Sequence, residues 1–201
     1  MSPSRPKRRS LKSTDRRVDL AVTGGIGAGK SEALQAFARH GAAVISSDEI
    51  VHRLLREDED VQRELAQRLG ADVIGPGGAD RGRIAELVFA DPEQLAWLEA
   101  LLHPKVVREY LAWRERQTTS VTVSEIPLLY ETGGEERFDA VVVITAPPEV
   151  RARRARVDAA ERERRLLPEE EKVRRADFVY VNDGSLEELD AFVADVLARV
   201  S

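Results

Sequence analysis

Residues 18–31 of the chain read VDLAVTGGIGAGKS. The apolar run 18–24 predicts a buried β-strand, and an amphipathic helical pattern begins at Lys30. Between the two, Gly24 to Ser31 fit the pattern G-x-x-x-x-G-K-[ST] in the strand–loop–helix setting that the pattern requires. The stretch therefore predicts a phosphate-binding loop on the first strand of an α/β domain.

A loop of this composition can hold the phosphates of a nucleoside triphosphate. Its glycines let backbone N–H groups curl around a phosphate, and the following helix adds the positive end of its dipole. We expect Lys30 to reach the β- and γ-phosphates and the Ser31 hydroxyl to bind Mg²⁺. A flexible glycine turn that happens to precede a lysine is the simpler alternative. The expected nucleotide contacts are Gly25, Ile26, Gly27, Ala28, Gly29, Lys30 and Ser31.

The rest of the chain alternates short β-branched runs with longer amphipathic stretches. Five strands separated by helices favour an α/β fold with a parallel sheet flanked by helices. The expected strands are 18–24, 42–46, 121–126, 140–145 and 178–182. The expected helices are 30–39, 48–55, 61–68, 83–89, 92–116, a long charged helix through 148–175, and 186–200.

Two regions stand apart from this alternation. Residues 48–120 contain several helical patterns and no convincing strand, which predicts a helical insertion. Residues 1–17 hold seven Lys or Arg and one Asp, which is typical of a disordered, solvated tail. No apolar core follows these charges, so we expect no secretory signal and a cytoplasmic protein.

Composition excludes several classes of protein. The chain has 201 residues, no cysteine and three histidines, which argues against disulfides, thiolate zinc sites and cysteine nucleophiles. No apolar stretch approaches the roughly 18 residues of a membrane helix. Residues 18–201 contain 24 basic and 35 acidic residues, so this part of the chain is negatively charged. An acidic body of this kind disfavours an RNA-binding function through the tail.

Several short segments, taken together, resemble the dephospho-CoA kinase family from about Asp19 to the end of the chain. They are LAVTGGIGAGKS (20–31), SSDEIVH (46–52), DR (80–81), VFADPE (88–93), LEALLHP (98–104), EIPLLYE (125–131), PPEVRARR (147–154), LPEEEK (167–172) and ADFVYVNDGSLEEL (176–189).

The resemblance implies transfer of the ATP γ-phosphate to the ribose 3′-hydroxyl of dephospho-CoA, the last step of coenzyme A synthesis. It implies a P-loop kinase core over 18–201, with a helical substrate subdomain at 49–119 and a lid region at 148–175. ATP and dephospho-CoA are the implied partners and Mg²⁺ the implied cofactor. We expect a monomer with no membrane or nucleic-acid partner.

The catalytic residues implied by the resemblance are Lys30, Asp48 and Arg154. Asp48 occupies the last position of a family motif that is usually Asp-Ala-Asp, where it would act as the base or orient the acceptor hydroxyl; a simple helix N-cap is the alternative. Ser46 replaces the first aspartate of that motif. Arg154 and Arg162 match lid arginines, although crowded arginines usually form a solvated helix face. The lid region is also shorter than is usual in the family.

The remaining implied site residues each have a structural alternative. Glu125 is a metal-binding acid or an exposed charge at the end of a strand. Arg81 binds the substrate or pairs with Asp80. His103 binds the substrate or ends a helix before Pro104. Asn182 lies near the adenine of ATP or serves only as a turn residue.

Two other functions remain open from the sequence. One is another P-loop small-molecule kinase, such as a nucleoside monophosphate or sugar kinase. A second is a degenerate, non-catalytic ATP-binding relative. A nucleotide switch would need a guanine-recognition motif N-K-x-D, which the sequence lacks.

Overall fold

The computed structural model describes residues 17–154 and 166–200, which form two compact units. The first unit comprises the described residues up to Ile45 and from Thr118 onward. The second unit is Ser46–Gln117.

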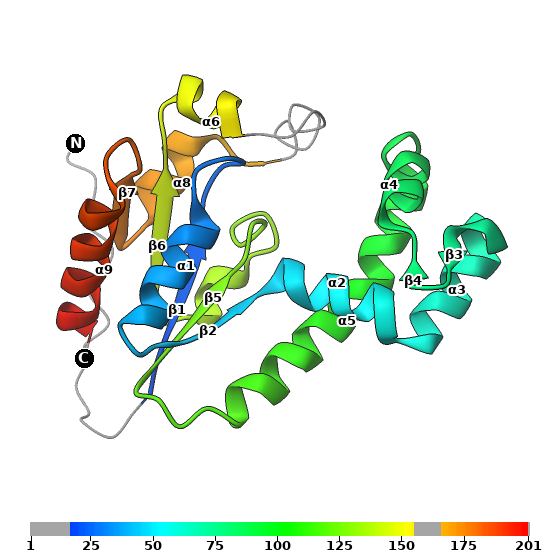
Figure 1. The fold of residues 1–201 in the computed structure, drawn as a ribbon, viewed down its shortest axis with the longest axis horizontal. Coiled ribbons are helices and arrows are strands. Elements are labelled where there is room, and N and C mark those ends of the chain that lie inside the picture. Colours follow the sequence, from blue (N-terminus) through cyan, green and yellow to red (C-terminus); the bar gives the residue numbers. More distant parts are fainter. Residues whose placement is uncertain (1–16, 155–165, 201) are drawn as a thin grey trace, which may run out of the picture. The chain divides into compact units, whose positions relative to one another are not determined.

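A five-stranded sheet forms the centre of the first unit, in the order β2–β5–β1–β6–β7 (Figure 1). Its strands are β1 (Val18–Thr23), β2 (Ala43–Ser46), β5 (Val121–Glu125), β6 (Ala140–Thr145) and β7 (Phe178–Val181). β1 pairs in parallel with β5 and β6, and β6 pairs in parallel with β7. The predicted α/β fold with a five-stranded parallel sheet is confirmed. Because β1 is central, the loop that follows it lies at the middle of the sheet's carboxyl edge, where ligands of such sheets bind.

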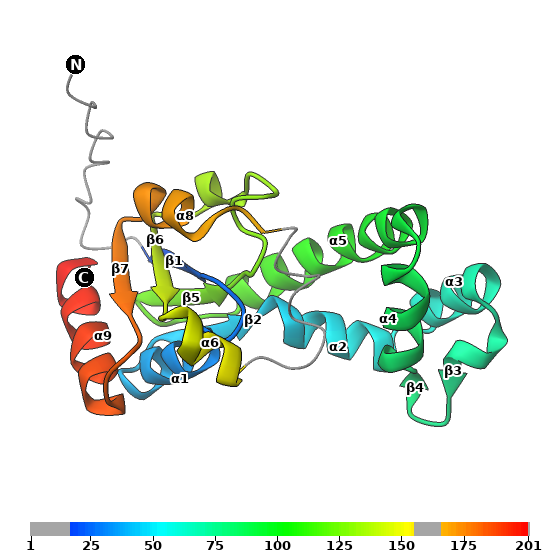
Figure 2. The same cartoon turned by 90° about the horizontal axis from the view of Figure 1, so that it is seen from above.

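Helices cover both faces of this sheet. α1 (Lys30–Arg39) and α9 (Leu186–Val200) pack on one face, and α8 (Glu169–Arg175) lies on the other (Figure 2). Buried apolar residues recur along α9 every three or four positions, as in an amphipathic helix. Its buried side chains are Leu189, Val193, Val196 and Val200, which join Leu20, Val22, Phe37, Val142 and Ile144 in one core. The short helices η2 (Gly134–Arg137) and α6 (Pro148–Arg154) complete the unit.

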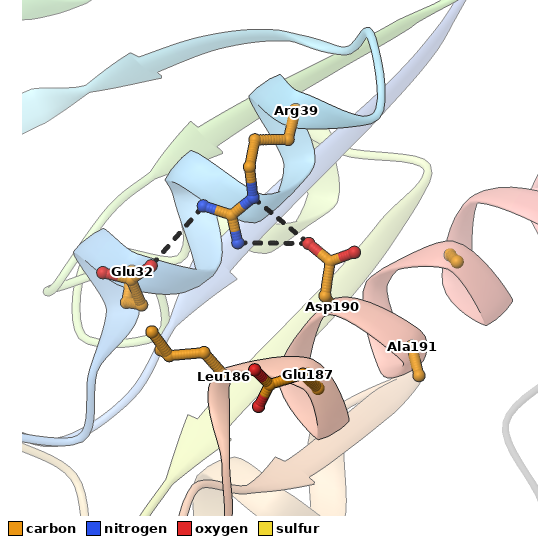
Figure 3. A pocket seen from close by; sticks show the side chains of 7 residues that line it. Glu32, Arg39, Leu186, Glu187, Asp190 and Ala191 are labelled. Atoms are coloured by element: carbon orange, nitrogen blue, oxygen red, sulfur yellow. Dashed lines mark hydrogen bonds and ion pairs between the residues drawn. The ribbon is translucent and has the colours of Figure 1, made fainter.

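Between α1 and α9 lies an open surface pocket of about 500 Å³ (Figure 3). Arg39 donates to Asp190 Oδ1 at 3.1 Å, and its Nη1 lies 3.5 Å from Glu32 Oε1. His40 Nε2 lies 2.8 Å from the other oxygen of Asp190. The hydrogen bonds from His40 and Arg39 lower the pKa of the Asp190 carboxyl. These side chains are between about a third and a half exposed, so the pairs contribute little to stability.

The second unit is mainly helical. Its elements are α2 (Ser47–Glu57), α3 (Glu59–Leu69), η1 (Ala71–Val73), β3 (Ile74–Gly75), β4 (Gly78–Ala79), α4 (Arg81–Phe89) and α5 (Pro92–Glu115). The expectation of no strand between 48 and 120 was wrong, because β3 and β4 form an antiparallel hairpin. Pro76 and Gly77 supply its two-residue turn, and two-residue strands are too short to give an alternating pattern in the sequence.

Helix α5 runs through Pro104 without ending. The alternative that His103 ends a helix is therefore wrong. An internal proline removes one backbone hydrogen bond, and the helix nevertheless continues beyond it to Glu115.

Aspartates begin three of the helices in this unit. Asp58, Asp80 and Asp91 accept hydrogen bonds from the first-turn N–H groups of α3, α4 and α5. Asp58 also accepts from Lys105 Nζ of α5 at 2.8 Å. Burial opposes ionisation of Asp58, but hydrogen bonds from Lys105 and from Val61 N–H outweigh it and lower the pKa of the carboxyl.

We expect Asp58→Ala to reduce the free energy of unfolding by about 1–2 kcal/mol, since it removes a helix cap and an ion pair together. Because the folded-state pKa is lowered, the stabilisation from ionised Asp58 is complete above about pH 4 and is lost as the pH falls through the folded-state value. Denaturant unfolding of the variant and the parent chain between pH 3 and pH 7 measures both effects.

Asp60→Ala is the matched control, because Asp60 is exposed and pairs with Arg63 within the same helix. It should change stability by less than about 0.5 kcal/mol. Equal losses in the two variants would show that the cap and the contact with Lys105 contribute nothing.

Candidate functional site

The loop between β1 and α1 has the backbone geometry of a phosphate cradle. Gly27 and Gly29 have φ angles of 74° and 95°, in the left-handed region that favours glycine. Gly29 is the N-cap of α1 and has no side chain to cover the helix end. The N-terminal N–H groups of α1 can therefore bind an anion. Lys30 Nζ donates to the Gly25 carbonyl at 3.0 Å, which holds the ammonium group at the loop.

Asn182 joins this loop from a distant part of the chain. It follows β7, is buried, and donates from Nδ2 to the Ala28 carbonyl at 2.9 Å. The structure thus brings Asn182 to the nucleotide loop, where it fixes the backbone. Contact with adenine and the alternative of a turn residue that binds no ligand both stay predictions.

Helix α6 brings arginines to the same loop. A Cβ atom built on Gly25 would lie 2.6 Å from Arg151 Nη1, and one built on Gly27 would lie 2.6 Å from the Arg151 carbonyl oxygen. Arg154 is more exposed, and its Nη1 would lie 3.6 Å from a Cβ atom on Gly29. Arg151 and Arg154 are therefore both neighbours of the loop, although the family resemblance selects Arg154 as the catalytic one of the two.

Glu125 and Ser31 carry oxygen atoms near the loop that could act as metal ligands. Glu125 ends β5 in register with Val22 of β1 and is 5% exposed, so the alternative of an exposed strand-end charge is wrong. The Ser31 hydroxyl lies in the first turn of α1 and is exposed. Hydroxyl and carboxylate oxygens are ligands that suit Mg²⁺. In residues 17–154 and 166–200, no cluster of three acidic or histidine side chains could bind a metal by itself.

In the second unit, Asp48 lies in the first turn of α2 and is exposed. The N-cap of α2 is Ser46, so the alternative that Asp48 is only an N-cap is wrong. One helical turn later, His52 has a lowered pKa, because burial and the charge of Arg81 outweigh the opposing charges of Asp48 and Glu49. His52 is a candidate site residue that sequence reasoning did not single out.

The other two predicted substrate residues are also exposed. Arg81 is the first residue of α4, and the side chain of Asp80 accepts from Arg83 N–H as the helix cap. His103 lies in the middle of α5. Both are therefore accessible to a ligand.

The predicted long helix through 148–175 is wrong as a single element. α6 ends the described stretch at Arg154, and α8 begins at Glu169 after the extended residue Pro168. The proline and the extended preference of the residue before it explain this break. Arg162 lies outside the described residues.

Lys172 of α8 is buried, with Nζ 2.9 Å from Glu131 Oε1, and Glu131 also accepts from Leu167 N–H.

A parallel sheet with this loop at its central strand, an acid at the end of the adjacent strand and arginines over the loop defines a P-loop kinase core. A shikimate kinase from Acinetobacter baumannii has the same fold, with a TM-score of 0.52 at 15% identity over 94% of this chain and 98% of that one.

The sequence model of the dephospho-CoA kinase family matches residues 18–188. A dephospho-CoA kinase of Thermus thermophilus is 38% identical over 191 residues, which are 92% of each chain. That of Streptomyces avermitilis is 36% identical over 90% of this chain and 93% of the relative. The structure of the Campylobacter jejuni dephospho-CoA kinase has a TM-score of 0.67 at 26% identity, over 91% of this chain and 96% of that one.

The chain belongs to the dephospho-CoA kinase family. It is an ATP-dependent phosphotransferase that converts dephospho-CoA to coenzyme A, and its ATP chemistry implies a divalent metal. No helix in the described residues is both long and apolar enough to span a membrane.

Proposed function

We propose that the first unit binds ATP and that the second unit supplies the groups that bind and activate the acceptor. The main support is the P-loop between β1 and α1, in a chain whose family match extends over residues 18–188. In this proposal the 3′-oxygen of dephospho-CoA bonds to the γ-phosphorus, and the bond from that phosphorus to the β–γ bridging oxygen breaks. ADP is the leaving group.

Each group in the loop has a distinct role in this proposal. The N–H groups from Gly25 to Ser31 bind the phosphates, and Lys30 compensates charge between the β- and γ-phosphates. Asn182 keeps the loop in shape through its bond to Ala28. Mg²⁺ is the proposed metal, with Ser31 and Glu125 as the residues that would hold it. When bound, it neutralises charge on the β- and γ-phosphate oxygens.

Asp48 accepts the proton of the attacking 3′-hydroxyl or fixes its orientation. Phosphoryl transfer depends mainly on positioning and charge neutralisation, so a single carboxylate is sufficient on the acceptor side. Arg154 stabilises the oxygens of the transferred phosphoryl group, an effect worth about 10³–10⁵ in rate where it has been measured. Arg81 and His103 are proposed to bind dephospho-CoA, and residues 148–175 to form the lid region.

An ADP-release assay with Mg-ATP and a panel of acceptors tests this function. We expect turnover with dephospho-CoA alone, with coenzyme A identified by its mass, and none with AMP, adenosine, gluconate or shikimate. Shikimate is the informative control, because shikimate kinase has the same fold. Turnover with another acceptor would show that the chain has a different kinase activity. ATP binding without any turnover would indicate a degenerate relative.

A further inference from the structure

Arg151 has a more enclosed position than the arginine that the sequence selects as catalytic. Its side chain is 18% exposed, whereas Arg153 and Arg154 on the same helix are exposed. The guanidinium occupies the space beside Gly25, the residue whose carbonyl also accepts from Lys30. Any shift of this guanidinium would therefore change the surroundings of the loop residue that holds the catalytic lysine.

A carboxylate from a distant part of the chain lies against this guanidinium. Glu169, the first residue of α8, places Oε2 at 3.7 Å from Arg151 Nη1. The other carboxylate oxygen accepts a hydrogen bond from the hydroxyl of Thr145, the buried last residue of β6. The carboxylate is thus fixed to the sheet on one side and faces the arginine on the other. A Cβ atom on Gly25 would also lie 3.3 Å from Glu169 Oε2.

We propose that Arg151 and Glu169 are positioning residues for ATP binding. Thr145 orients Glu169, Glu169 holds Arg151, and Arg151 supports the phosphate loop at Gly25. This proposal rests on the proposed ATP site and adds two residues to it that contact the loop and each other. A fixed guanidinium keeps the loop in the conformation that receives the phosphates, and it adds positive charge beside that loop.

The first test uses Glu169→Gln and Arg151→Gln in the full chain. We expect each to raise the Kd and the KM for ATP about 10-fold, the usual effect of losing one charge-assisted contact. The KM for dephospho-CoA should stay unchanged. The double variant should be no worse than the more affected single variant, because both substitutions break the same contact. The matched controls are Glu170→Gln and Arg153→Gln, which alter exposed neighbours on the same two helices and should behave as the parent chain.

A second test leaves both charges in place. Gly25→Ala would put a methyl group 2.6 Å from Arg151 Nη1 and displace the guanidinium. We expect a similar rise in the Kd for ATP, and adding Gly25→Ala to Arg151→Gln should cost less than it does in the parent chain. This variant decides the matter if Glu169→Gln does not fold.

Wild-type ATP affinity in both single variants, additive effects in the double variant, or an equal rise in the KM for dephospho-CoA would overturn the proposal. The Kd for ATP is measured without an acceptor, by titration calorimetry. A failure of the proposed acceptor reaction is therefore distinguishable from a failure of the Arg151–Glu169 contact.

Discussion

Lys30→Ala is expected to reduce kcat with dephospho-CoA on the order of 10³-fold, as removal of a single electrostatic stabiliser does in other enzymes. The ammonium group is held at the loop by its bond to the Gly25 carbonyl, 3.0 Å away. Without it, the charge that develops between the β- and γ-phosphates has no side-chain cation from the loop. Single-turnover measurements at saturating Mg-ATP separate this loss from weaker ATP binding.

Two further variants make this result interpretable. Lys30→Met keeps the length of the side chain and should be as inactive as the alanine variant. Arg39→Ala removes a cation from the last turn of the same helix, where the side chain is 48% exposed, and should retain the parent rate. A rate for Lys30→Ala within about tenfold of the parent would disprove the assignment of the phosphate loop.

The elements that the sequence predicts well are those with a strong local signal. The strands around Leu20 and Val142 are mostly apolar and buried on both faces, and α1 and α9 have clear amphipathic periods. The loop from Gly24 to Ser31 was predictable because its glycines, lysine and serine are adjacent in the chain. For all of these, the residues that determine the structure lie within one short segment.

The features that the sequence missed depend on contacts between distant segments. Whether Glu125 is buried depends on the register of β5 against β1. The choice between Arg151 and Arg154 depends on how α6 packs against the loop, since both residues lie on one charged helix. Glu169 reaches Arg151 only because α8 lies beside the end of β6, and no spacing in the sequence predicts that contact.

Asp48→Asn should lower kcat by about 10²–10⁴-fold, the range for loss of a general base, and leave the Kd for ATP unchanged. The exposed carboxylate of Asp48 is not the cap of α2, so its replacement should alter helix stability only through the helix dipole, by about 0.3–1 kcal/mol. Kinetic measurements can therefore distinguish a role of Asp48 as proton acceptor from a structural role. Pre-steady-state measurement of phosphoryl transfer, with titration calorimetry for ATP, gives both quantities.

Glu49→Gln is the matched control for Asp48→Asn, because Glu49 is the next residue, is also exposed and also lies in the first turn. It should retain the parent kcat. Both carboxylates raise the pKa of His52, so each variant should lower that pKa further, which NMR titration of the imidazole can follow. If both variants lower the pKa of His52 equally but only Asp48→Asn loses kcat, the loss reflects a catalytic role of Asp48. A general loss of negative charge would reduce kcat in both variants. If ATP affinity falls while the rate per bound ATP is preserved, Asp48 is instead a residue of the nucleotide or metal site.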